Sequence, residues 1–194
     1  FEYLHRVLGR LIGLMYFVPL VIFALRKMIA PQLLPTLILL LILGAAQGLL
    51  GWYMVKSGLV DRPSVSQYRL TAHLGVAVAI YALMMWLVLR VSSGLSPALR
   101  HIRGWGWVLV VGVYTLILSG GFMAGTDAGF AYPTWPMMGE TFVPRGYYAE
   151  GWQATFEGVA TIHFNHRMLA YAMALLVLVL SVQSLRTSDH PGVR

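Results

Sequence analysis

Residues 33–55 read LLPTLILLLILGAAQGLLGWYMV, an uncharged run that ends at Lys56. A helix that crosses a membrane needs about 20 mostly apolar residues, because each residue adds only about 1.5 Å to its length. This stretch therefore predicts a transmembrane helix. Four more stretches have the same character: Glu2–Leu25, 68–89, 105–124 and 162–185. The sequence predicts an all-α integral membrane protein with five transmembrane helices in this chain.

The composition of the whole chain agrees with that fold class. Hydrophobic residues make up 58% of the 194 residues, charged residues make up 11%, and the mean hydropathy is +0.71. A soluble domain of this size could not bury so much apolar surface, which excludes a soluble enzyme and a disordered tail. The net charge of +7 does not indicate nucleic-acid binding, because the basic residues form no polar face. The absence of cysteine excludes disulfides, thiolate metal sites and cysteine nucleophiles.

The long segment 125–161 is rich in glycine, proline and aromatic residues. Its length and composition predict a structured cap at the membrane interface rather than a free linker.

The orientation of the helices follows from the distribution of basic residues. The helices at 2–25, 68–89 and 162–185 begin on one face, and both faces carry seven basic residues. Four of those on the helix-start face stand beside histidines at helix entrances; they are Arg6, Arg10, Arg69 and Arg167. Without these four, the helix-start face carries three basic residues and the opposite face carries seven. The positive-inside rule then places the helix-start face outside.

Three histidines lie about one turn inside the membrane at these helix starts. They are His5, His73 and His166, with Arg6, Arg69 and Arg167 nearby. Ionisable residues within spans are costly and are therefore functional candidates. Imidazole ligates haem iron, and arginine at the membrane surface can pair with a haem propionate. We therefore expect these histidines to ligate haem iron.

Other interpretations of the histidines are weaker. A single histidine in a span can hydrogen-bond to a neighbouring helix, but three at one level favour haem, and zinc is disfavoured because no HExxH motif is present. His101 in a basic loop and His190 in the polar tail are expected to be solvated. His163 shares a helix face with His166, and is either a supporting residue or an alternative ligand.

Small residues recur within two of the predicted helices. They are Gly44, Ala45, Gly48 and Gly51 in the second, and Gly120, Gly121 and Gly125 at the end of the fourth. This spacing favours close helix packing, with room for haem as a secondary consequence.

A short internal repeat predicts the wider architecture. A shift of 161 residues aligns LHRVL at 4–8 with NHRML at 165–169. The repeat predicts one span before Phe1 and two beyond Arg194, giving eight spans in two pseudo-symmetric four-helix halves. Residues 1–104 would belong to the first half and 105–194 to the second. We therefore expect this chain, which begins at Phe1 without a signal-peptide pattern, to be part of a longer protein.

The same alignment places Glu2 opposite His163, so the two halves differ at this position. A carboxylate beside a ligand histidine can accept a proton, which makes Glu2 a catalytic candidate. The alternative is an acid favoured at a helix N-terminus by the helix dipole.

Several motifs resemble those of haem A synthases, in the branch shared by proteobacteria and mitochondria. They are EYLHR at 2–6, QGLLGWYMVKSGL at 47–59, VSQYRL at 65–70, AHLG at 72–75, AGTDAG at 124–129, PMMGE at 136–140 and FNHR at 164–167. The resemblance covers nearly the whole chain. The paired loop cysteines of some Gram-positive members are absent, as expected for this branch.

The resemblance implies an eight-span oxidoreductase that converts the C8 methyl of haem O to the formyl of haem A for cytochrome oxidase, by successive hydroxylation. His5 and His73 would serve the substrate haem with Glu2 as the required acid, and His166 would be an axial ligand of haem b. The implied location is the bacterial inner membrane, or the mitochondrial inner membrane in a eukaryote.

The implied partners are the lipid bilayer, haem O synthase as haem donor and an unidentified electron acceptor, with no nucleic acid. A homo-oligomer is compatible with the sequence. The sequence is also compatible with two rival functions: a di-haem b-type cytochrome that relays electrons, and a haem-binding assembly protein without chemistry. Glu2, present in one half only, argues against a pure electron relay.

Overall fold

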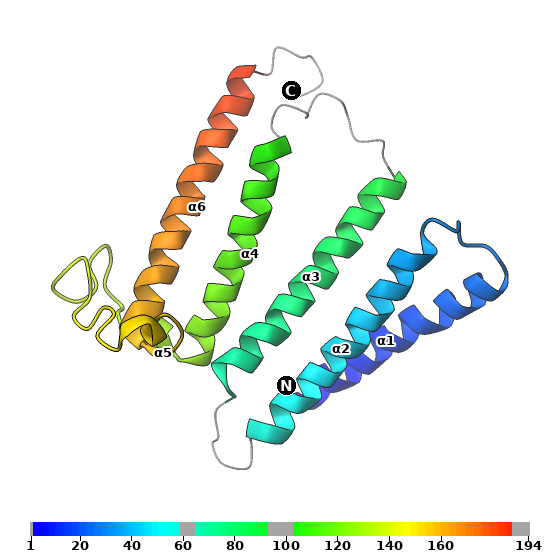
Figure 1. The fold of residues 1–194 in the computed structure, drawn as a ribbon, viewed down its shortest axis with the longest axis horizontal. Helices are drawn as coiled ribbons and strands as arrows, with labels where there is room; N and C mark the ends of the chain where they lie inside the picture. The colour runs from blue at the N-terminus through cyan, green and yellow to red at the C-terminus, as the bar shows by residue number, and fades with distance from the viewer. Residues whose placement is uncertain (1, 59–64, 93–102, 188–194) are drawn as a thin grey trace. The chain divides into compact units, whose positions relative to one another are not determined.

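The computed structural model describes residues 2–58, 65–92 and 103–187, most of which are helical. Five helices are long and apolar enough to cross a membrane (Figure 1). They are α1 (Glu2–Leu25), α2 (Leu34–Gly58), α3 (Gln67–Ser92), α4 (Arg103–Gly125) and α6 (Val159–Thr187). These described ranges contain no β-strand, so the prediction of an all-α membrane protein with five spans in this chain is confirmed.

The apolar surfaces of the five helices are mostly uncovered by the rest of the chain. The mean hydropathies of these helices are 1.5 to 2.1, yet only 6% of an apolar 18-residue stretch of each helix is buried within the protein. Contiguous apolar surface of this extent is not stable in water, so lipid or further helices must cover it.

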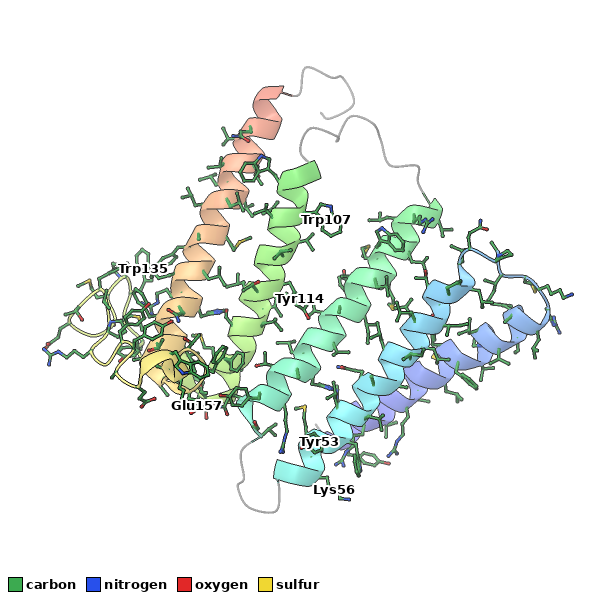
Figure 2. The ribbon with its side chains drawn as sticks, in the orientation of Figure 1. Tyr53, Lys56, Trp107, Tyr114, Trp135 and Glu157 are labelled. Carbon is green, nitrogen blue, oxygen red and sulfur yellow. The ribbon has the colours of Figure 1, made fainter. Side chains whose placement is uncertain are left out.

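Two helices carry in their last turn a basic residue that lies over a tryptophan. In α2, the ammonium of Lys56 lies 4.8 Å from the ring centre of Trp52, and in α3 the guanidinium of Arg90 lies 5.1 Å from that of Trp86. Tryptophan and basic side chains are both favoured at the boundary between lipid and water. These pairs therefore suit helix ends that emerge from a membrane (Figure 2 labels Lys56).

The chain forms two compact units. The first comprises Phe1–Val65 and Gly75–Leu95, and the second comprises Ser66–Leu74 and Ser96–Arg194. The first two turns of α3 thus belong with α4 and α6, while the rest of α3 groups with α1 and α2. The division of the protein into halves at residue 104 stays a prediction.

In the first unit, α1 and α2 pack side by side (Figure 1). Leu20 of α1 and Leu40 of α2 are both buried. The Tyr16 hydroxyl donates a hydrogen bond to the carbonyl of Leu37 at 2.9 Å. Such a partner offsets the cost of placing a hydroxyl inside an apolar helix pair.

In the second unit, α4 and α6 form the most extensive helix pair (Figure 1). Glycines on α4 allow this approach. A Cβ at Gly112 would collide with the sulfur of Met173, and a Cβ at Gly120 would lie 3.3 Å from the His166 ring. Small residues let membrane helices approach closely and gain packing contacts that lipid does not provide.

The first turns of α3 lie against the end of α4 through two more glycines. A Cβ on Gly121 would be 3.1 Å from the Cα of Thr71, and one on Gly125 would be 2.6 Å from the Cα of Gln67. Because these neighbours are backbone atoms, they cannot rotate aside. The glycines of α4 therefore serve helix packing, the interpretation that the sequence analysis favours.

The segment between α4 and α6 is folded onto the second unit, and we call residues 126–158 the cap. It contains two short 3-10 helices, η2 (Ala128–Phe130) and η3 (Gly151–Gln153), and the one-turn helix α5 (Ala154–Glu157). The backbone N–H of Tyr148 donates to the Thr161 hydroxyl at 3.0 Å, and Thr161 is fully buried. The expected cap is thus structured, and its place at the membrane interface stays a prediction.

We expect Gly121→Val to destabilise the second unit, because the added side chain must separate α4 from the α3 backbone. The cost should be about 1–3 kcal/mol in the free energy of unfolding, as for other overpacked cores. Thermal unfolding in detergent measures it as a lower midpoint. The matched control is Gly106→Val on the same helix, where a Cβ would have no neighbour within 4 Å. Equal losses in both variants would contradict the assigned packing role.

Candidate functional site

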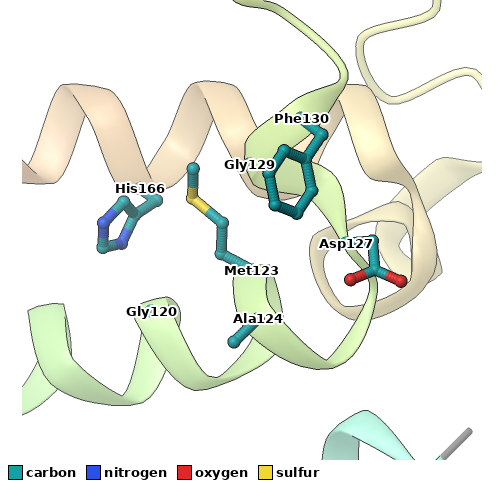
Figure 3. Close-up of a pocket in the computed structure, with 7 residues that line it drawn as sticks. All are labelled: Gly120, Met123, Ala124, Asp127, Gly129, Phe130 and His166. Atoms are coloured by element: carbon teal, nitrogen blue, oxygen red, sulfur yellow. The ribbon is translucent and has the colours of Figure 1, made fainter.

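A cavity of about 360 Å³ lies beside the imidazole of His166 in the second unit (Figure 3). Its volume falls within the range of about 300–1,000 Å³ that is usual for small-molecule sites. Its walls are mostly apolar and come from the end of α4, from η2 and from α6. The lining residues are Gly120, Met123, Ala124, Asp127, Gly129, Phe130 and His166.

The His166 ring is held between two neighbours on α4. Its Nδ1 lies 2.7 Å from the hydroxyl oxygen of Ser119, which also donates to the carbonyl of Leu116 at 2.8 Å. A Cβ at position 120 would lie only 3.3 Å from Cε1 of His166, so the glycine leaves the space that the ring needs. The imidazole is therefore fixed in position while it lines an apolar cavity.

Asp127 is the only carboxylate among the lining residues of this cavity. Its backbone has φ 54° and ψ 19°, the left-handed conformation that asparagine and aspartate adopt more readily than other non-glycine residues. This residue turns the chain from the end of α4 into η2, and its side chain is exposed. In the sequence, the surrounding AGTDAG motif stands out only as part of a resemblance, and the structure places it at the cavity.

His163 lies on the same helix as His166 but in a different environment. Only 4% of its surface is exposed, its Nε2 lies 3.1 Å from Nη2 of Arg167, and its ring packs edge-on against Tyr132. Because guanidinium nitrogens can only donate, the lone pair of His163 Nε2 accepts this hydrogen bond. Of the two roles left open by the sequence, this arrangement favours a supporting residue.

Arg167 fastens the cap to α6. Its two terminal nitrogens lie 3.2–3.5 Å from four carbonyl oxygens of the cap, those of Tyr132, Thr134, Pro136 and Met137. Hydrogen bonds from a charged group are worth more than neutral ones. In the structure, the side chain expected to pair with a haem propionate therefore holds the cap, and a propionate would have to share these donors.

Aromatic side chains of the cap cover the start of α6. Tyr147 and Phe142 pack edge-on against Phe164, with ring centres 4.8 and 6.1 Å apart. The indole N–H of Trp135 donates to the Tyr171 hydroxyl at 2.6 Å. These contacts keep the cap close to the helix that carries His166 (Figure 2 labels Trp135).

The phenol of Tyr148, in the cap, has a lowered pKa. Hydrogen bonds with Thr155 and Asn165, the first the stronger cause, lower the pKa of its phenol below the usual value. Its ring packs against Tyr147 at 4.7 Å.

The far end of the cap is tied to the first turn of α3. The Tyr68 hydroxyl donates to a carboxylate oxygen of Glu157 at 2.7 Å, and Phe122 packs between the rings of Tyr68 and Phe156. His73 follows on the same helix and is half-buried. The second unit thus contains two of the three predicted ligand histidines, His73 and His166.

The remaining predicted residues lie elsewhere. His5 and Arg6 are on an exposed stretch of α1 in the first unit, and Glu2 begins α1, with its side chain outside the described residues. His101 and His190 also lie outside the described residues. Within the described part of the chain, no group of three or more His, Asp or Glu side chains is placed to hold one metal ion.

Ser119 was missed by the sequence analysis. A serine hydroxyl among the apolar residues of α4 is a weak signal, because serine in a span often bonds only to its own helix. Its proximity to His166 depends on how α4 and α6 pack, which the sequence does not show.

The arrangement around His166 suits a flat, mostly apolar ligand with a metal ion that binds an imidazole nitrogen. The cavity supplies apolar walls, and the fixed imidazole supplies a ligand atom. Haem has these properties, and its iron is commonly held by histidine.

Comparison with known proteins agrees with this chemistry. The family model described as cytochrome oxidase assembly protein (COX15-CtaA) matches residues 1–194. The chain is 46% identical over 190 residues to a haem A synthase from Nitrosospira multiformis, covering 94% of this chain and 53% of that protein. It is 44% identical to one from Nitrosomonas eutropha (89% and 51%) and 42% identical to one from Rhodospirillum centenum (100% and 53%).

The chain spans about half the length of the curated relatives that it matches. No solved structure matches it.

We expect Arg167→Ala to loosen the cap, because four cap carbonyls and His163 lose a charged donor. A decrease of about 1.5 kcal/mol in the free energy of cap opening would raise the population of the open cap roughly tenfold. Trypsin reports this opening through cleavage after Arg145, an exposed cap residue with 87% of its side-chain surface accessible. The control is Arg90→Ala, whose guanidinium lies over Trp86 on α3. An unchanged cleavage rate in Arg167→Ala would show that these hydrogen bonds do not hold the cap.

Proposed function

Because the chain belongs to the COX15-CtaA family of cytochrome oxidase assembly proteins, we propose that it forms part of a haem A synthase. The reaction is oxidation of the C8 methyl of haem O to a formyl group, by successive hydroxylation of a CH bond. The product, haem A, serves cytochrome oxidase. Haem is both substrate and cofactor in this proposal.

The observation that carries the proposal is the apolar cavity against a fixed imidazole. His166 lines the cavity, and Gly120 leaves the clearance that its ring needs. These residues fit haem b, whose iron His166 would hold through a ring nitrogen. When bound, haem b supplies one-electron transfer. The protein orients the imidazole, and Met123 and Phe130 give the cavity apolar lining.

Arg167 has a double role in this proposal. Its guanidinium holds the cap in place through backbone carbonyls, and it lies one residue from the ligand His166. A propionate entering from the cap side would exchange with some of these carbonyls. Arg167 would then link haem retention to cap closure.

The substrate haem is assigned to the other predicted half. His5 and His73 are the proposed ligands of haem O, with Arg6 beside His5 as the partner of a propionate. Glu2 is the proposed catalytic acid, because it lies three residues before His5 on α1 and so shares its helix face. Its carboxylate would accept a proton near the reacting methyl group.

The wider setting follows from the same proposal. The protein would lie in the bacterial inner membrane, or in the mitochondrial inner membrane in a eukaryote. It would receive haem O from haem O synthase and pass electrons to a separate acceptor. The complete protein would have eight spans in two pseudo-symmetric halves, and a homo-oligomer is compatible with this architecture.

We expect His166→Ala to abolish the low-spin, bis-histidine haem b spectrum of the protein as its host makes it. The variant removes an axial ligand and leaves the apolar walls intact. Optical and EPR spectra of the purified membrane protein measure the result. His163→Ala is the matched control on the same helix, and should keep the bis-histidine signature even if less protein folds. An unaltered spectrum in His166→Ala would remove His166 from the ligand set.

We expect Glu2→Gln to stop haem A formation while haem b stays spectrally normal. The substitution keeps the size and hydrogen-bonding capacity of the side chain but removes its charge and basicity. Haem extraction from cells that rely on this variant should yield haem O or its hydroxylated intermediate. Normal haem A levels would remove Glu2 from the catalytic set. If the protein were an electron relay or a haem carrier, even the wild-type protein would form no haem A.

A further inference from the structure

The contact between Ser119 and His166 bears on which nitrogen of the imidazole carries the proton. The serine hydroxyl has a single hydrogen, and its oxygen lies 2.8 Å from the Leu116 carbonyl, which can only accept. With that hydrogen donated to Leu116, the serine oxygen is an acceptor toward His166 Nδ1 at 2.7 Å. This arrangement favours the tautomer in which Nδ1 of His166 carries the ring proton and Nε2 keeps its lone pair.

The opposite arrangement is less favourable. If the hydroxyl donated to Nδ1, the Leu116 contact would lose its hydrogen bond and the ring proton would sit on Nε2. The Nε2–H would then face the side of the ring on which the cavity residues Met123, Ala124 and Phe130 offer no side-chain acceptor. The arrangement with Nδ1 protonated therefore keeps both hydrogen bonds of the Ser119 hydroxyl, and the opposite one keeps only the bond to His166.

Gly120 completes the restraint on the ring. A Cβ at this position would lie 3.3 Å from Cε1 of His166, so the imidazole edge rests against the backbone of α4. Ser119 holds Nδ1 from one position and Gly120 supports the adjacent carbon. Two consecutive α4 residues thus limit both the rotation and the tautomer of one histidine.

We propose that Ser119 is a positioning residue for His166, holding the imidazole as the Nδ1–H tautomer and presenting Nε2 as the iron ligand. The proposal rests on the proposed function, because it takes His166 as a haem b ligand. A hydrogen bond from the far nitrogen fixes the orientation of a ligand histidine and increases its basicity. A more basic axial ligand stabilises ferric over ferrous haem, so Ser119 lowers the midpoint potential of haem b.

Ser119→Ala tests this role in the protein as its host makes it. The variant removes the acceptor and leaves the Nδ1–H of His166 without its partner. We expect an upward shift of the haem b midpoint potential and a changed EPR signal of the ferric form. Haem affinity should fall about tenfold, the lower end of the effect of removing such a partner.

Two conservative variants separate a positioning role from a packing role. Ser119→Thr keeps the hydroxyl and should restore the wild-type potential. Ser119→Cys keeps the approximate size but offers a weaker acceptor, so it should shift the potential in the same direction as alanine but less. If Ser119→Ala holds no haem, the shift in Ser119→Cys decides the test.

Thr115→Ala is the matched control. Thr115 lies one turn earlier on α4 and donates to the Val111 carbonyl at 2.9 Å, the same kind of bond within the helix, and it is exposed. Its loss should leave potential and EPR signal unchanged. A potential that does not move in Ser119→Ala or Ser119→Cys would overturn the proposal, as would an equal shift in Thr115→Ala.

Different results would disprove the ligand assignment of His166 and the positioning role of Ser119. If His166→Ala keeps the haem b spectrum, the ligand assignment and the proposed use of this cavity both fail. If His166→Ala loses the spectrum while the Ser119 variants keep the wild-type potential, only the role of Ser119 fails.

Discussion

The close packing of α4 against α6 is the constraint on which the site depends. Lipid tails are as apolar as leucine, so two membrane helices gain little by excluding lipid and gain mainly from tight contact. Gly112 accommodates Met173, and Gly120 accommodates His166, so the helices approach at two levels. A wider separation would break the 2.7 Å contact between Ser119 and His166 and leave the imidazole free to rotate.

The sequence predicted the fold class and the helices well, because the requirements of a bilayer are local. A span needs length and apolar character, and both are visible in residues 33–55 and their counterparts. The first helix ends where expected at Leu25, and α4 and α6 extend only a few residues beyond 105–124 and 162–185. The histidine of the site, His166, was also visible, because an ionisable residue in an apolar helix is conspicuous.

The contacts around the site were not predictable in the same way, because they join residues far apart in the chain. The Arg167 guanidinium reaches carbonyls some 30 residues away, and Ser119 reaches His166 across 47 positions. Backbone carbonyls carry no sequence signature, so no pattern could indicate that Arg167 holds the cap. The grouping of the first turns of α3 with α4 depends likewise on Gly121 and Gly125 meeting the backbone of one particular helix.

The two histidines of α6 show how partners, rather than spacing, assign a role. His163 and His166 are three residues apart and would be neighbours on one helix face. The lone pair of His163 Nε2 accepts a hydrogen bond from Arg167, so it is already engaged, and the ring is buried beneath Tyr132. His166 instead has its proton on the side of Ser119 and lines an apolar cavity. A metal ligand needs a lone pair that no donor already holds, and of these two residues His166 meets that condition.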